Sequence, residues 1–252
     1  MKKTSVLVTL NIWYNNIKIK YHPRGFFMRF SKSALILFTY VFAMFFLPTI
    51  SLLLLLNFTS ITEETSLKVY VNLISYIFLM IVTLRLFGKQ IIEDFKKINS
   101  VGEFIKGTLI GWCLLLVCLM ISNYLLFFVK GIYESSENQQ VIVNVMEVHP
   151  ILMAMTTVIF APVVEEIIFR MTLMKKTLLH PWVSILLSSL LFGLIHVIAA
   201  GDFIFVIPYM AMGIPLGYSY YKTKNICYPI GIHILQNLFS TLMITVPFFL
   251  SY

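Results

Sequence analysis

Charged residues are scarce in this sequence, and their scarcity excludes a soluble fold. Only 12% of the 252 residues are Asp, Glu, Lys or Arg, whereas 59% are hydrophobic, and the mean hydropathy is +0.89. A soluble domain carries about twice that share of charge. The length is sufficient for roughly six to eight helices of about 20 residues each and for no large additional domain. The composition therefore predicts an all-α, polytopic transmembrane bundle of about seven to eight helices.

Motifs of several common enzyme classes are also absent. The three cysteines show no CxxC pattern and no Cys/His spacing of a metal site, so no disulfide framework is expected. The sequence contains no HExxH, no glycine-rich phosphate loop and no recognisable Ser-His-Asp order. These absences argue against zincin-type, nucleotide-dependent and serine-hydrolase chemistry.

Seven apolar runs are long enough to be membrane spans. They are Ala34–Leu56, Val69–Leu86, Gly107–Val129, Pro150–Leu173, Val183–Ala200, Phe203–Tyr221 and Ile226–Leu250. Residues 33–252 are thus expected to form one membrane bundle. Residues 1–32 are basic and rich in aromatic residues, and we expect them to lie in the inner interface, with an unstructured basic tail as the alternative.

The connections between these runs alternate in charge. Lysines and arginines precede the first run and fill the second, fourth and sixth connections, whereas the first, third and fifth connections are acidic. The acidic residues are Glu63, Glu64, Glu134, Glu137, Glu147 and Asp202, and the same connections contain only two lysines, Lys68 and Lys130. The positive-inside rule then predicts a protein of the cell membrane with a cytoplasmic N-terminus and an external C-terminus. The net charge of +8 follows from this topology and from anionic lipid, and no nucleic-acid partner is expected.

Three charged residues lie inside the fourth run, where charge is costly. Glu165, Glu166 and Arg170 occur within the segment AMTTVIFAPVVEEIIFRMTLM. A charged side chain at the bilayer centre costs roughly 2.5–3.5 kcal/mol on insertion scales, so these side chains should face the protein interior. Glu166 and Arg170 are spaced i, i+4 and can form a buried ion pair, whose role is as open to a structural as to a functional interpretation.

Glu165 differs from its neighbour, because no basic residue lies three or four positions away on its own helix. Other polar groups lie in the later runs: His196 in LLFGLIHVIAA, and His233 and Asn237, which share a helical face, in GIHILQNLF. A lone intramembrane His is more often a hydrogen-bond partner between helices than a catalyst. Together with Glu165, however, these residues from three runs predict one polar site. A Glu and a His can deprotonate a water that attacks a carbonyl, while a second His and an Asn stabilise the oxyanion.

The chain resembles the CPBP intramembrane endopeptidases, the family that includes the CAAX prenyl proteases, in three ordered signatures. EExxxR, FxxxH and HxxxN are met by Glu165-Glu166-x-x-x-Arg170, Phe192-x-x-x-His196 and His233-x-x-x-Asn237. The resemblance covers about residues 150–240, which would be the catalytic core. One departure is Met171, where many members carry Gly; it removes no catalytic group.

The resemblance implies about eight helices around a cavity accessible from the cytoplasm. It assigns activation of the water to Glu165 and His196, orientation of the site to Glu166 and Arg170, and stabilisation of the transition state to His233 and Asn237. Zn²⁺ is a conceivable cofactor on Glu165, His196 and His233. A mechanism without a metal is favoured, since Asn is a poor zinc ligand and Arg170 already balances one carboxylate.

The expected partners are the lipid bilayer and a hydrophobic peptide or membrane-protein substrate, with peptide pheromone or bacteriocin processing or self-immunity as possible roles. Two other classes remain open from the sequence. The first is a non-catalytic immunity or regulatory partner, which would keep its activity after loss of Glu165. The second is a proton-coupled transporter, since buried Glu, His and Arg also form proton relays. The absence of an internal repeat speaks against the transporter.

Overall fold

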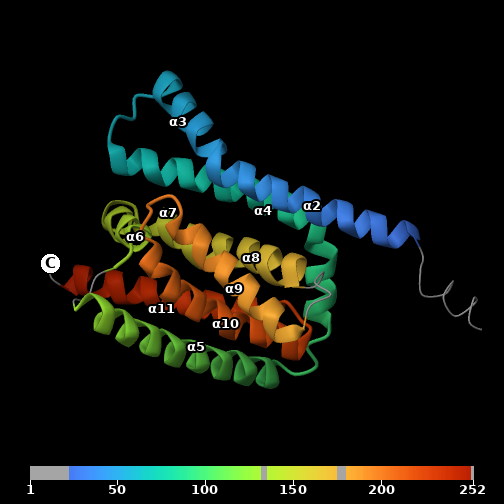
Figure 1. The fold of residues 1–252 in the computed structure, drawn as a ribbon. Coiled ribbons are helices and arrows are strands. Elements are labelled where there is room, and N and C mark those ends of the chain that lie inside the picture. Colours follow the sequence, from blue (N-terminus) through green and yellow to red (C-terminus); the bar gives the residue numbers. More distant parts are fainter. Residues whose placement is uncertain (1–22, 132–134, 175–179, 251–252) are drawn as a thin grey trace, which may run out of the picture.

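The chain forms a bundle of helices, and a computed structural model describes residues 23–131, 135–174 and 180–250 (Figure 1). The described part contains no strand, which confirms the predicted all-α, polytopic architecture. The elements are α2 (Pro23–Phe45), α3 (Leu47–Phe58), α4 (Glu64–Lys96), α5 (Val101–Lys130), α6 (Glu137–Val148), α7 (Pro150–Ala154), η1 (Met155–Phe160), α8 (Ala161–Glu166), η2 (Ile167–Leu173), α9 (Pro181–Val197), η4 (Phe203–Phe205), α10 (Val206–Thr223) and α11 (Cys227–Leu250). Most of the expected interfacial segment 1–32 lies outside the described residues, and its last part, from Pro23, already belongs to α2.

The expected spans correspond to helices, with one correction. Five helices are long and apolar enough to cross a membrane, and α9, with 17 residues, is apolar but shorter. The first expected span, 34–56, is not one straight helix, because α2 and α3 meet at Phe46 with a bend of 46° between Lys32–Phe45 and Leu47–Phe58. Pro48 explains the bend, since it lacks the N–H that would continue the helix and its ring clashes with the preceding turn.

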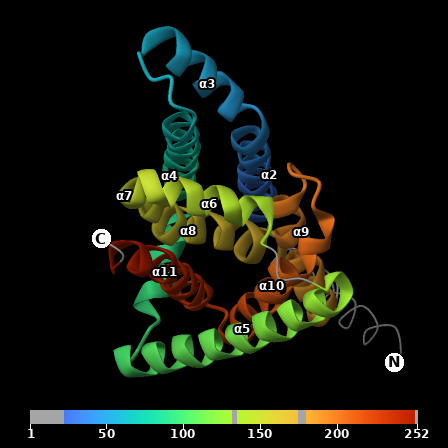
Figure 2. The ribbon, with the colours of Figure 1, turned by 90° about the vertical axis from the view of Figure 1, so that its left-hand side faces the viewer.

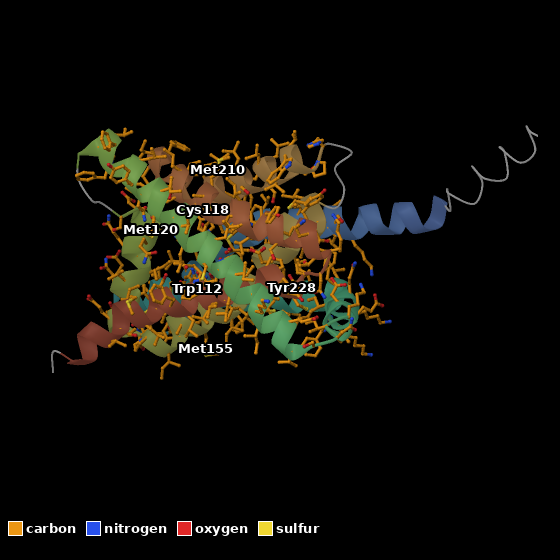
Figure 3. All side chains as sticks on the ribbon, turned by 90° about the horizontal axis from the view of Figure 1, so that it is seen from below. Trp112, Cys118, Met120, Met155, Met210 and Tyr228 are labelled. Atoms are coloured by element: carbon orange, nitrogen blue, oxygen red, sulfur yellow. The ribbon has the colours of Figure 1, made fainter. Side chains whose placement is uncertain are left out.

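The helices are arranged around the segment that runs from α7 to η2. The bent pair α2 and α3 packs along α4 at one side of the molecule (Figures 1 and 2). The α7–η2 segment lies between α4 and the group of α9, α10 and α11. On the opposite side, α5 crosses α10 and α11 diagonally, with Trp112 and Tyr228 at the contact (Figure 3). The charged fourth run is therefore the central element, as its polarity requires.

Glycines allow the closest helix contacts. A Cβ atom on Gly213 of α10 would lie 2.8 Å from both Cα and Cβ of Ser189 in α9. On α5, a Cβ atom on Gly107 would lie 2.8 Å from the ring of Tyr228, and one on Gly111 would overlap Ile232, both in α11. Small residues at such positions let helix backbones approach within a membrane, where packing rather than hydrophobicity drives association.

One helix was not expected from the apolar runs. α6 has 12 residues, too few to span a bilayer, and it lies across the ends of the longer helices (Figure 2). Its sequence ENQQVIVNVMEV is too polar for a span, yet two of its own residues, Val145 and Met146, are buried against the bundle. Ser136 begins the helix, because its hydroxyl accepts a hydrogen bond from the amide of Gln139.

The far end of α4 is fixed to the turn between α10 and α11 by Asp94. This buried carboxylate accepts a hydrogen bond from the amide of Ile226 at 3.2 Å and is bound by Lys97 at 2.6 Å. The side chain of Asn225 donates to the carbonyl of Asp94 at 2.7 Å. The contact thus joins elements more than 130 residues apart.

We predict that Asp94→Ala lowers the stability of the detergent-solubilised protein. The loss of a buried acceptor leaves the amide of Ile226 unpaired, at a cost of about 1–3 kcal/mol. Each kcal/mol corresponds to roughly 2–4 °C in Tm for a chain of this size. Glu93→Ala, which removes an exposed neighbouring carboxylate, is the matched control and should leave Tm unchanged. Equal Tm values for the two variants in a thermal-shift assay would contradict the assigned role of Asp94.

Candidate active site

The helix that carries the two glutamates is wound irregularly. π-helical stretches at Met155–Phe160 and Ile167–Leu173 flank the short α8, in which Glu165 and Glu166 are consecutive. Pro162 lies in the first turn of α8 and cannot donate the hydrogen bond of a regular helix. Such π-helical stretches occur often at functional sites, because they redirect side chains without breaking the helix.

Glu166 and Arg170 form the expected ion pair. Glu166 Oε2 lies 3.2 Å from Arg170 Nε, and both side chains are 0% exposed. A second nitrogen of the guanidinium, Nη2, donates to the carbonyl of Gly213 in α10 at 3.1 Å. The guanidinium also lies 4.9 Å from the centroid of the Phe192 ring. Arg170 thereby connects η2 to both α9 and α10.

His233 connects the same carboxylate to α11. Its Nδ1 lies 2.9 Å from Glu166 Oε1. Since a carboxylate accepts the hydrogen bond, Nδ1 carries the proton and Nε2 faces the other direction. That atom lies 3.9 Å from Glu165 Oε2, which is too long for a direct hydrogen bond but allows one water to bond to both atoms. The two glutamates are thus on the two sides of one imidazole.

Glu165 has an environment different from that of Glu166. Its Oε1 accepts a hydrogen bond of 3.0 Å from the hydroxyl of Tyr76 in α4. The side chain is nearly buried, with 3% of the residue exposed, and no Lys or Arg among the described residues forms an ion pair with it. Glu165 is held by a neutral donor, the hydroxyl of Tyr76, whereas the charge of Glu166 is balanced by Arg170.

The site contains a cavity of about 550 Å³, and the predicted residues differ in whether they line it. Glu165, His196, His233 and Asn237 line it, together with Tyr76. Glu166 and Arg170 do not line it and lie behind His233. The structure therefore brings all six predicted residues into one cluster but places only four of them where a ligand can reach.

His196 lies in the last turn of α9 and is oriented from two sides. Its Nδ1 donates to the carbonyl of Phe192, one turn earlier, at 2.7 Å, so Nε2 is the nitrogen that can accept a hydrogen bond in the neutral ring. The ring stacks on Tyr209 of α10 with centroids 4.4 Å apart. The hydroxyl of Tyr209 in turn bonds Ser136 and Asn138 at the start of α6, at 2.8 and 3.1 Å.

Asn237 lies one turn after His233 and donates to the carbonyl of Thr157 in the η1 stretch at 2.8 Å. This bond uses one of its two amide hydrogens. The neighbouring Gln236 is held by Trp112 of α5, whose indole N–H donates to it at 3.0 Å. The last helix thus contributes His233, Gln236 and Asn237 to the cavity wall.

The donor set considered for zinc does not converge. No group of three His, Cys, Asp or Glu side chains in the described part of the chain has the geometry to hold a metal ion. Nδ1 of His196 is bonded to Phe192 and Nδ1 of His233 to Glu166, so only the Nε2 atoms of the two rings could act as ligands. Nε2 of His233 lies 3.9 Å from Glu165 Oε2. The described side chains therefore do not fit a bound metal ion.

Sequence reasoning missed Tyr76 and Tyr209. Tyr76 had a signal: Asn72 lies one helical turn before it, so two polar residues share a face of an apolar span, and both line the cavity. Tyr209 had none, because its contact with His196 depends on how α9 and α10 pack.

Comparisons with known proteins find similarity to membrane proteases. A family model described as "Type II CAAX prenyl endopeptidase Rce1-like" matches residues 147–239. The chain is 29% identical over 177 residues to the "Putative membrane peptidase YdiL" of Bacillus subtilis (strain 168), with 69% of each chain covered. It is 26% identical over 183 residues to the "Membrane-embedded CAAX protease MroQ" of Staphylococcus aureus (strain USA300), covering 69% of this chain and 73% of that one. No solved structure matches.

We predict that Arg170→Met destabilises the protein strongly. It leaves Glu166 as an uncompensated buried charge, which costs about 3–5 kcal/mol. The double variant Glu166→Gln with Arg170→Met removes both charges and should recover a large part of that loss. The two variants are compared by thermal unfolding in detergent. A double variant no more stable than the single one would show that the ion pair is not what Arg170 contributes.

Proposed function

The chain belongs to the CPBP family of intramembrane proteases, and from this membership we propose that it hydrolyses peptide bonds with Glu165 as the catalytic base. The observation that carries the proposal is the environment of Glu165. Its carboxylate lines the cavity, forms no ion pair with a described Lys or Arg, and faces the Nε2 atom of His233 at 3.9 Å. A base must lie within hydrogen-bond reach of the proton that it takes, directly or through one water.

Hydrolysis would begin with a water held between Glu165 and the imidazoles. Glu165 takes one proton from this water while the oxygen of the water attacks the carbonyl carbon of the substrate. His196 orients the water by accepting its other hydrogen at Nε2, because Nδ1 is engaged by Phe192. The tetrahedral intermediate then collapses, and the protonated Glu165 gives its proton to the leaving amine as the C–N bond breaks.

His233 and Asn237 are assigned to the oxyanion. In this scheme His233 enters the step as an imidazolium and keeps both protons: Nε2–H donates to the developing negative charge, while Glu166 holds Nδ1 and Arg170 balances Glu166. Asn237 supplies its second amide hydrogen. Glu166 and Arg170 are positioning residues in this scheme, because neither lines the cavity.

The substrates that suit this site are hydrophobic peptides or segments of membrane proteins. The cavity is large enough for several residues in an extended conformation and has apolar as well as polar walls. A short lipid-associated peptide, such as a peptide pheromone or bacteriocin precursor, fits this description, as does a toxin peptide in self-immunity. A non-catalytic regulatory role of the same protein is the alternative that a Glu165 variant separates.

We predict that Glu165→Gln abolishes cleavage without unfolding the protein. The loss of a general base costs about 100-fold to 10,000-fold in rate, whereas the amide can still accept the hydrogen bond of Tyr76. Mass spectrometry of peptides and membrane proteins from cells with the intact or the Glu165→Gln chain measures the effect. Glu147→Gln makes the same change at an exposed position and is the control. If fragments are identical in the three strains, or a phenotype survives Glu165→Gln at normal abundance, the proteolytic assignment fails.

We also predict that the purified protein cleaves its substrate in the presence of metal chelators. The described residues offer no convergent set of three ligands, so removal of divalent ions should leave the rate within about twofold of its original value. The measurement is the cleavage rate in detergent before and after chelation and dialysis, followed by addition of Zn²⁺. Loss of activity that Zn²⁺ restores would overturn the metal-independent mechanism.

A further inference from the structure

The ends of the helices form two groups of opposite charge. Where α4, α6 and α10 begin and α3, α5, α9 and α11 end, the charged residues are mainly acidic; this acidic end is at the left of Figure 1. Its acidic members in the described chain are Glu63, Glu64, Glu137, Glu147 and Asp202. Where α4 and α10 end and α5 begins, lysines dominate, and this basic end includes Lys89, Lys96, Lys97, Lys106, Lys222 and Lys224.

The cavity extends from the catalytic residues toward the acidic end alone. Its deepest lining residues are Tyr76, Leu119, Glu165, Met212 and His233. On α4, α5, α10 and α11, every other described lining residue lies between these positions and the acidic end of its helix. The lining continues to Ser135, an exposed residue just before α6, and to Asn138 and Gln139 on α6 itself.

Packed apolar side chains separate the site from the basic end. Phe87, Ile167, Phe169, Tyr220 and Ile226 belong to one cluster, and each is less than 10% exposed. Ile226 lies in the turn between α10 and α11, where Asp94 binds its amide. A peptide would have to displace this core to reach Glu165 from the basic end, whereas the route from the acidic end already exists.

We propose that substrates enter this active site from the non-cytoplasmic side of the membrane. Lysine-rich connections are retained in the cytoplasm, so the acidic end and the cavity mouth face outward. The proposal rests on the function proposed above and narrows it to peptides that have crossed the membrane and to the outer ends of membrane-protein segments. It departs from the cytoplasmic access that the family resemblance implied, because that access and the positive-inside orientation are incompatible in this fold.

The test uses single cysteines in the full-length chain in intact cells. The background replaces Cys113, Cys118 and Cys227 by Ala and is first shown to retain Glu165-dependent cleavage. Ser135→Cys places a thiol at the cavity mouth, Glu64→Cys places one at the acidic end outside the cavity, and Lys96→Cys places one at the basic end. Each strain is treated with a membrane-impermeant maleimide before or after permeabilisation.

The expected result is equal labelling of Ser135→Cys and Glu64→Cys in intact and permeabilised cells, and labelling of Lys96→Cys only after permeabilisation. Reagent added to intact cells should also stop cleavage by the Ser135→Cys protein but not by the Glu64→Cys protein. The reverse labelling pattern would overturn the proposal, as would undiminished cleavage by fully labelled Ser135→Cys protein. Absence of any Glu165-dependent cleavage would instead refute the proposed function, since labelling reports the orientation without a reaction.

Discussion

The structure depends on the burial of one guanidinium. Arg170 is fully enclosed, and a buried cation is tolerated only where opposite charge and acceptors surround it. Glu166, the carbonyl of Gly213 and the ring of Phe192 meet that requirement from three helices. The close approach of α10 to α9 at Gly213 brings the carbonyl within reach. The charge in the centre of the bundle thus fixes how the surrounding helices pack, and the irregular α7–η2 segment supplies it.

The two adjacent glutamates acquire different chemistry from this arrangement. Glu166 is committed to Arg170 and to Nδ1 of His233, so its orientation and charge are fixed. Glu165 bonds a neutral hydroxyl and otherwise faces the cavity. His233 lies between them, and because its Nδ1 is occupied, only Nε2 is directed to the side of Glu165. Glu166 thus fixes the orientation of the His233 ring from one side, and this ring faces the carboxylate of Glu165 on the other side.

The sequence was sufficient for the features that depend on local spacing. Apolar runs located the spans, and the i, i+4 spacing of Glu166 and Arg170 predicted their ion pair. Pro48 indicates the bend at Phe46, but the apolar residues on both sides of it form one continuous run, which predicted a single straight span. The contact of Tyr76 with Glu165 spans 89 residues, and the stacking of Tyr209 on His196 depends on two packed helices, so neither follows from spacing. Likewise, only the packing shows that His233, and not a residue of α9, separates the two glutamates.

The shortness of α9 has a consequence for the surrounding lipid. Its 17 residues span about 25 Å, whereas the hydrocarbon core of a bilayer is about 30 Å thick. Trp182, Leu187 and Leu191 are exposed on this helix, so it meets lipid directly, and any tilt increases the hydrophobic mismatch. A span shorter than the hydrocarbon core is accommodated by local thinning of the bilayer, by flanking side chains that reach the interface or by oligomerisation, each at a cost of a fraction of a kcal/mol for each Å of mismatch. The thickness of the bilayer, which depends on the length of the lipid acyl chains, thus acts on the helix that carries His196.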